Sequence, residues 1–283
     1  MNVGAILAGF GSAICFAVGS ALEQSAAKRE PIPRTLDPRL ILRLARRPRW
    51  LLGWVPEGAG TGLQAYALSS APLALIEPLL ISGLFMAIPL AATLNRRRVY
   101  RRDFGVVALG GAGLVAFLIA AHPRPGVSEP SRAAWLGVAL WAGPALVVCL
   151  TTAWRSSGAM RGALLGVATG LLYGLGASLL KTVTAQLARD PAGVFLRPEL
   201  YALAVVGGFA VVLNQHAFQS GRIAVPLTAI TIVDPFAGVL IGVTAFQESL
   251  ATGWVSITVQ VIGVLAMAGG IWFAAKTPKP QPS

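Results

Sequence analysis

Three carboxylates lie inside long apolar stretches of the chain, and they are the residues best suited to chemistry: Asp234, Glu57 and Glu77. An ionised side chain at the centre of a bilayer costs about 3 kcal/mol on insertion scales, so it faces a cavity or a partner. Carboxylate oxygens bind hard cations such as Mg²⁺, and they also take up and release protons. The three residues therefore form the candidate site. The alternative for each is an internal pair or tight packing, and which metal they would bind, if a divalent cation is carried, is open.

Helix-breaking residues accompany each carboxylate. Asp234 follows Arg222 by twelve residues, about 18 Å along a helix, which puts it near the midplane. Its neighbour Pro235 removes a backbone donor and leaves a carbonyl oxygen free to face a solute. Glu57 lies in the glycine-rich segment 55–62, which predicts a broken helix or close packing of small residues. Glu77 lies nearer one face, where an interfacial carboxylate is the alternative. The predicted helix breaks or hinges are Pro56, Pro78, Pro226 and Pro235.

Uncharged polar residues complete the candidate substrate-binding or coupling set: Gln64, Asn214, Gln215 and His216. Buried amides can bind a polar solute, and a histidine can relay protons or make an interhelical hydrogen bond. Lys181 is predicted to lie at the end of its apolar stretch and to extend its ammonium group to the membrane surface.

The elements that position these residues are apolar helices. The 283 residues are 55% hydrophobic and 12% charged, with a mean hydropathy of +0.69, whereas soluble domains carry about 25% charged residues. This composition excludes a soluble enzyme, a disordered chain and a disulfide scaffold. It predicts an all-α polytopic membrane bundle of about nine spans, with a ten-helix variant left open. The nine apolar stretches are 2–22, 50–69, 72–95, 103–121, 133–153, 160–182, 199–219, 222–246 and 254–275.

Basic residues set the predicted orientation. Of the 23 Lys and Arg residues, 18 fall in one alternating set of connections, which places them in the cytoplasm. The N-terminus is then outside, the C-terminus is cytoplasmic, and the chain is a multi-pass protein of the plasma (inner) membrane. The net charge of +12 thus reflects topology and not a nucleic-acid partner. The basic cytoplasmic loop 23–49 could bind anionic inner-leaflet lipids over 28–49, or only fix topology. The tail 276–283 is predicted to be disordered.

An internal duplication is visible in the order of small residues. Gly9 and Gly19 match Gly166 and Gly176 at one offset, and similar matches join the next three helices to later ones, ending with Gly113 and Gly263. The predicted organisation is a first repeat over 1–121, a connector with the fifth span over 122–159, and a second repeat over 160–275. An odd number of spans separates each helix from its copy, so the repeats are inverted. Inverted repeats with a midplane site are typical of secondary transporters.

Two segments carry a resemblance to a known family. Gln64-Ala65-Tyr66-Ala67-Leu68-Ser69-Ser70-Ala71-Pro72-Leu73 and Asn214-Gln215-His216-Ala217-Phe218-Gln219-Ser220-Gly221 resemble the drug/metabolite transporter (EamA-like) superfamily. Within it, the chain is most similar to the NIPA-like branch and to actinobacterial proteins of the drug/metabolite type. Several NIPA proteins are described as magnesium transporters, so the resemblance implies divalent cations as one substrate class. Glu57-Gly58 lies further upstream than the Gly-Glu pair of that branch, and Gln247-Glu248 only partly matches the superfamily's Gly-Glu.

The sequence thus predicts a secondary or facilitative transporter that moves a small polar solute by alternating access. The alternatives are a magnesium or divalent-cation transporter, a flippase for lipid-linked head groups, and a non-transporting scaffold for envelope biosynthesis. A membrane enzyme is not expected, since the sequence has no nucleophile or metal motif. No cofactor is expected, the partners are membrane lipids and the solute or ion, and a homodimer is left open.

Overall fold

The computed structural model describes residues 3–27, 48–83, 85, 101–219 and 224–275. Within these ranges the chain is almost wholly helical, and its one β-bridge joins Arg124 to Ser249. The helices are α1 (Val3–Ala27), α3 (Pro48–Ser70), α4 (Leu73–Leu80), α6 (Arg101–Ala121), α7 (Arg132–Arg155), α8 (Gly158–Arg189), η1 (Gly193–Leu196), α9 (Pro198–Gln219), α10 (Ala224–Thr244) and α11 (Trp254–Ala275).

Five of these helices are long and apolar enough to cross a membrane: Arg132–Arg155, Gly158–Arg189, Pro198–Gln219, Val225–Thr244 and Trp254–Phe273. Two shorter apolar helices, Val3–Gly19 and Ala108–Ala121, accompany them. The predicted all-helical class is confirmed for the described residues, and these helix lengths and compositions are consistent with a membrane bundle. Each of the nine predicted apolar stretches contains a helix, although only the first part of the stretch 72–95 is described.

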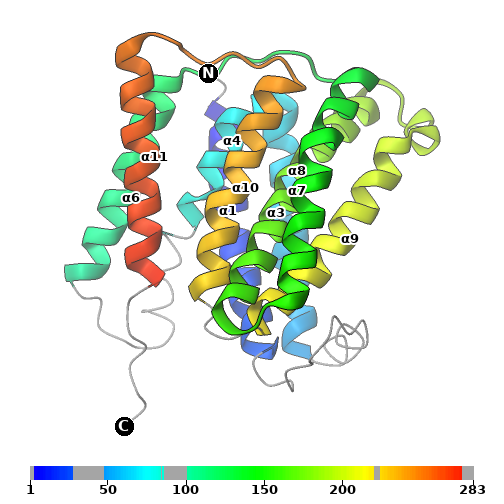
Figure 1. Cartoon of the computed structure of the whole chain (residues 1–283). Helices are drawn as coiled ribbons and strands as arrows, with labels where there is room; N and C mark the ends of the chain where they lie inside the picture. Colours follow the sequence, from blue (N-terminus) through cyan, green and yellow to red (C-terminus); the bar gives the residue numbers. More distant parts are fainter. Residues whose placement is uncertain (1–2, 28–47, 84, 86–100, 220–223, 276–283) are drawn as a thin grey trace.

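The helices form a bundle with two distinct edges (Figure 1). α6 and α11 pack against one another at one edge, and α9 packs on α8 at the other. Between them α1 packs against α3, and α10 packs against both α8 and α4. The connections α6–α7 and α10–α11 lie at the same end of the bundle, at the top of Figure 1, which is called the upper end below.

Glycines bring the central helices into backbone contact. Gly166, Gly170 and Gly174 occur every fourth residue along one face of α8 and lie against α10. A Cβ atom at Gly174 would lie 2.8 Å from the Asp234 carbonyl oxygen, and one at Gly170 would lie 2.9 Å from Val233 Cβ. Only a residue without a side chain permits this approach. The α10 backbone around Asp234 is therefore fixed by α8.

The same pattern of close contacts occurs in the first half of the chain. A Cβ atom at Gly9 of α1 would meet the side chains of Leu79 and Ile76, whereas one at Gly166 of α8 would meet Ala229 and Pro226 of α10. At the α6–α11 edge the contact is reciprocal. Gly113 faces the carbonyl oxygen of Gly263 and Gly263 faces that of Gly113, each 2.7 Å from the position of a Cβ atom.

The predicted helix breaks occur at one proline out of four. α3 continues through Pro56, α10 continues through Pro235, and Pro226 lies in the first turn of α10, where a proline costs no backbone hydrogen bond. The glycine-rich segment of α3 instead packs closely, since Ser12 Oγ donates to the Gly60 carbonyl oxygen at 2.8 Å. Only near Pro78, which lies inside α4, is a helix interrupted: α4 stops at Leu80, residue 81 forms a turn, and residues 82, 83 and 85 are helical again. The basic loop 28–47 and the tail 276–283 lie outside the described residues.

Candidate functional site

Glu77 and Asp234 are brought together where α4 meets α10. Glu77 is 1% exposed, and its carboxyl group lies close enough to that of Asp234 for the two to interact electrostatically. The Oδ1 atom of Asp234 is shielded from solvent and has no hydrogen-bond partner among the described residues. Glu77 therefore lies inside the bundle and not on its surface. These two residues are called the carboxyl pair below.

The carboxyl pair receives one further polar contact from α3. Gln64 is 8% exposed, and its Nε2 atom donates to Glu77 Oε1 at 3.1 Å. Three helices that are distant in the sequence therefore contribute one polar side chain each. Two of the predicted carboxylates and one predicted amide form a cluster, in which Glu77 and Gln64 are buried and Asp234 is half-buried.

Gly238 makes room for the stem of Glu77. A Cβ atom at Gly238 would lie 2.4 Å from Glu77 Cγ, and Gly238 follows Asp234 by one turn of α10. The same face of α10 thus provides the carboxyl partner of Glu77 and the space for its side chain. Because α8 presses on the other side of Asp234, the pair is enclosed by α4, α8 and α10.

Glu57 lies elsewhere in the structure. Its side chain lies against Gly19 of α1, where a Cβ atom would be 2.7 Å from Glu57 Cγ. Among the described residues no group of three His, Cys, Asp or Glu side chains is placed to hold a metal ion. The three carboxylates therefore do not combine into one cation site.

The polar residues of α9 form a separate group. Gln215 and His216 are 1% and 3% exposed, and His216 Nδ1 shares a 2.8 Å hydrogen bond with the Val212 carbonyl oxygen of its own helix. The Oδ1 atom of Asn214 is buried without a partner among the described residues. Since α9 packs mainly on α8, this group lies apart from the α4–α10 contact. The structure thus places Asn214, Gln215 and His216 away from the carboxyl pair.

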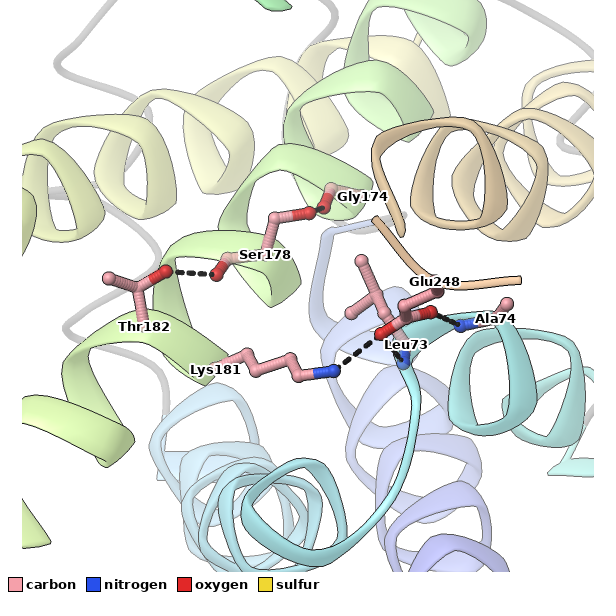
Figure 2. A network of polar contacts seen from close by, with 7 residues as sticks. All are labelled: Leu73, Ala74, Gly174, Ser178, Lys181, Thr182 and Glu248. Carbon is pink, nitrogen blue, oxygen red and sulfur yellow. Dashed lines mark hydrogen bonds and ion pairs between the residues drawn. The ribbon is translucent and has the colours of Figure 1, made fainter. Parts of the chain in front are cut away.

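A second buried polar cluster joins Lys181 to Glu248, and it corrects the prediction for Lys181 (Figure 2). Lys181 Nζ lies 2.5 Å from Glu248 Oε1, and the two side chains are 7% and 0% exposed. Lys181 therefore does not extend to the membrane surface. The reason is that α8 continues to Arg189, well beyond the apolar stretch that ends at residue 182. The ammonium group also lies 4.9 Å from the ring centroid of Phe246, a cation–π contact.

Glu248 also caps α4. Its two carboxylate oxygens accept from the backbone N–H groups of Leu73, at 2.7 Å, and Ala74, at 2.8 Å. The N-cap residue Pro72 makes no side-chain cap, so Glu248 satisfies donors that the helix start leaves open. Gln247, at φ +57°, makes the left-handed turn that directs Glu248 back into the bundle. Lys181 and Glu248 are called the ion pair below, and the start of α4 is the helix end that this pair caps.

Sequence reasoning missed this cluster, although two signals were present. One signal is a lysine within an apolar stretch, and the other is the Gln247-Glu248 step after a span. The ion pair and the carboxyl pair lie along one contact between α4 and α10. Gly242, two turns after Asp234, leaves space for Glu248, since a Cβ atom there would be 2.6 Å from Glu248 Oε2.

The chain is similar in sequence to a bacterial protein. Over 280 residues the chain is 24% identical to an uncharacterized protein of Corynebacterium glutamicum, covering 94% of this chain and 95% of that protein. No family model matches the chain, and no solved structure matches it. The likeness spans both halves of the chain, so the two proteins are similar over their whole length.

Proposed function

We propose that this protein is a secondary transporter in which the carboxyl pair couples a proton to the movement of a small polar solute. The observation that carries the proposal is the contact between Glu77 and Asp234 inside the bundle. Two acidic groups this close repel each other when both are ionised, which favours a proton on one of them. A group that can hold or release that proton is what ion-coupled transport needs, and buried carboxyls in membrane helices commonly have this role.

The unpartnered oxygen of Asp234 supports a binding role. A buried polar atom without a partner is costly, and a functional site is one reason for its retention. Gln64 and Asp234 Oδ1 together offer a donor and an acceptor to a polar solute. The solute would replace contacts that the carboxyl pair now makes internally.

The packing supports two inverted halves. Shifting Gly9 by 157 residues gives Gly166, and shifting its partners Ile76 and Leu79 by 150 residues gives Pro226 and Ala229, which are the partners of Gly166. The reciprocal contact of Gly113 and Gly263 is what a two-fold relation between α6 and α11 produces. In Figure 1 α1 and α8 run in opposite directions, as do α4 and α10. Such halves can expose a shared site to each side in turn.

Membership of the drug/metabolite transporter superfamily, an outside N-terminus and a location in the plasma membrane belong to the same proposal. The resemblance of segments 64–73 and 214–221 supports it, and so does the positive charge on one set of connections. A divalent-cation transporter is not advanced as a second function, because Glu57 lies apart from the carboxyl pair.

The test is proton movement in proteoliposomes that contain a pH-sensitive dye. A panel of amino acids, sugars, nucleosides, organic amines and Mg²⁺ is added one at a time, to wild type and to Asp234→Asn. We expect at least one solute to drive proton movement that Asp234→Asn abolishes. The matched control is Glu129→Gln, which removes a half-buried carboxylate paired with the exposed Arg189 and should leave the flux unchanged. Equal flux in wild type and Asp234→Asn for every solute would overturn the proposal and favour a scaffold.

A further inference from the structure

The ion pair joins three separate elements at the upper end of the bundle. Lys181 comes from α8, Glu248 from the connection between α10 and α11, and the capped N–H groups of Leu73 and Ala74 from α4 (Figure 2). α4 belongs to the first half of the chain, and the other two elements belong to the second half. Any separation of α4 from α8 at this end must break these contacts.

A continuous series of contacts along α4 and α10 connects the ion pair to the carboxyl pair. On α4, Glu77 follows Leu73 by four residues, one turn of helix. On α10, Asp234, Gly238 and Gly242 share one face, and they contact Glu77, the Glu77 stem and Glu248 in that order. About 12 Å of helix separates Asp234 from Gly242. A path from the upper end to the carboxyl pair would therefore run along the α4–α10 contact and meet the ion pair first.

The chemistry of the ion pair suits an element that opens. A buried ion pair gives little net stability compared with apolar residues of the same volume, because two charges must be desolvated. When water enters, each charge is hydrated separately, and the cost of separation falls. Apolar side chains in the same place would gain nothing from water. An ion pair here therefore favours a closed state that can still convert to an open, hydrated one.

We propose that the Lys181–Glu248 ion pair is the closed gate at the upper end of the transport path, and that it separates when the carboxyl pair becomes accessible from that side. This inference rests on the proposed transport function. The aromatic contact of Trp135 with Phe246, at 6.2 Å between ring centroids, covers the pair next to Lys181. In the state described here the upper end is closed.

The test measures access to a buried reporter below the ion pair. Ser178 lies one turn nearer the bundle centre on α8, is 0% exposed, and donates to the Gly174 carbonyl oxygen at 2.7 Å. Ser178→Cys is introduced after the two native cysteines, Cys15 and Cys149, have been replaced by alanine. A membrane-impermeant maleimide is then applied to whole cells, and separately to inside-out vesicles, so that each face is probed alone.

The comparison is between the intact ion pair and the double variant Lys181→Met/Glu248→Gln, which removes both charges together. We expect labelling from one face to rise about tenfold, as when a state populated at about 10% becomes the major one. The matched control, Arg189→Met/Glu129→Gln, removes the exposed ion pair of the same end and should label like the intact protein. Unchanged labelling in a monodisperse double variant would overturn the gate.

A second measurement on the intact ion pair covers the case in which the double variant does not fold. With Ser178→Cys and the ion pair intact, labelling from the face that reacts should change severalfold when the proton gradient is reversed. A constant rate in a protein whose flux is sensitive to Asp234→Asn would overturn the gate. The two proposals fail in different ways. If labelling increases but no flux is sensitive to Asp234→Asn, the gate proposal stands and the proposal of proton-coupled transport is rejected. If flux is sensitive to Asp234→Asn but labelling of Ser178→Cys changes neither with the ion-pair variant nor with the proton gradient, the transport proposal stands and the gate proposal is rejected.

Discussion

The ion pair and the carboxyl pair are two polar clusters on the same contact between α4 and α10, and they are built in opposite ways. In the ion pair the Glu248 carboxylate has three donors, namely Lys181 Nζ and two backbone N–H groups. In the carboxyl pair two acidic groups face each other, with one amide donor from Gln64. Opposite charges attract each other and hold the elements that carry them together. Two neighbouring acidic groups repel each other when both are ionised, so such a pair can bind a proton or a solute. The difference separates a group that closes the bundle from a group that binds.

The largest expected effect is on the ion pair. Lys181→Met should lower the free energy of unfolding by about 3 to 5 kcal/mol, because it leaves the buried Glu248 carboxylate without its cation. Chemical denaturation in detergent measures this loss. The control Arg189→Met breaks an exposed pair and should cost about 0.5 kcal/mol. Equal losses in the two variants would show that burial does not distinguish the pairs.

Gly238→Ala should have the next largest effect. The added methyl group would lie 2.4 Å from Glu77 Cγ, so the Glu77 side chain must move away from Asp234. Overpacking of this kind costs about 1 to 3 kcal/mol, and the displaced Glu77 should also reduce proton flux. The control is Gly208→Ala on α9, where nothing lies within 4 Å of the new atom. A Gly238→Ala protein with normal stability and flux would contradict the placement of Glu77.

Gln64→Met should have a smaller effect on stability. It removes the 3.1 Å hydrogen bond to Glu77 but keeps the length of the side chain. The expected loss is about 1 kcal/mol, together with a changed pH dependence of the flux, because the amide stabilises one charge state of its partner. Thermal unfolding and a pH series of proton flux measure the two. An unaltered pH profile would indicate that Gln64 only packs.

The smallest change in stability is expected for Asp234→Asn. The amide keeps the size of the side chain and can donate to Glu77, so unfolding should shift by no more than about 0.5 kcal/mol, while proton flux is abolished. Paired measurements of unfolding and flux on one preparation check this. A loss of several kcal/mol would instead give the carboxyl pair the structural role assigned to the ion pair.

The sequence predicted the helices well because apolar runs of sufficient length are directly readable. It also singled out Asp234 and Glu77, since a carboxylate in such a run is unusual, and the structure brings these two residues together. It did not predict that Glu57 lies apart, because depth along one helix says nothing of the direction in which a side chain points. The ion pair could not be predicted either, because sequence does not show which distant residues meet in space. Lys181 and Glu248 are 67 residues apart, and one of them lies in a connection that only the tertiary structure folds back.

Proline was the least reliable indicator. A break or close packing was predicted around Pro56, and α3 continues through Pro56 while Gly60 packs against α1. The same applies to Pro235, whose neighbourhood is fixed by Gly170 and Gly174 of α8. Local propensity therefore gave way to packing between helices, and only Pro78 lies close to a helix end.

The capping of α4 by Glu248 has a consequence for biosynthesis. The carboxylate is separated from the two N–H groups that it binds by 175 and 174 residues, which a ribosome needs roughly 10 to 35 s to add. During that interval the start of α4 must find water, lipid head groups or another protein as a temporary acceptor. The first half of the molecule is thus inserted before the start of α4 can be capped. Truncated chains that end before residue 248 should therefore be preferred targets of membrane quality control.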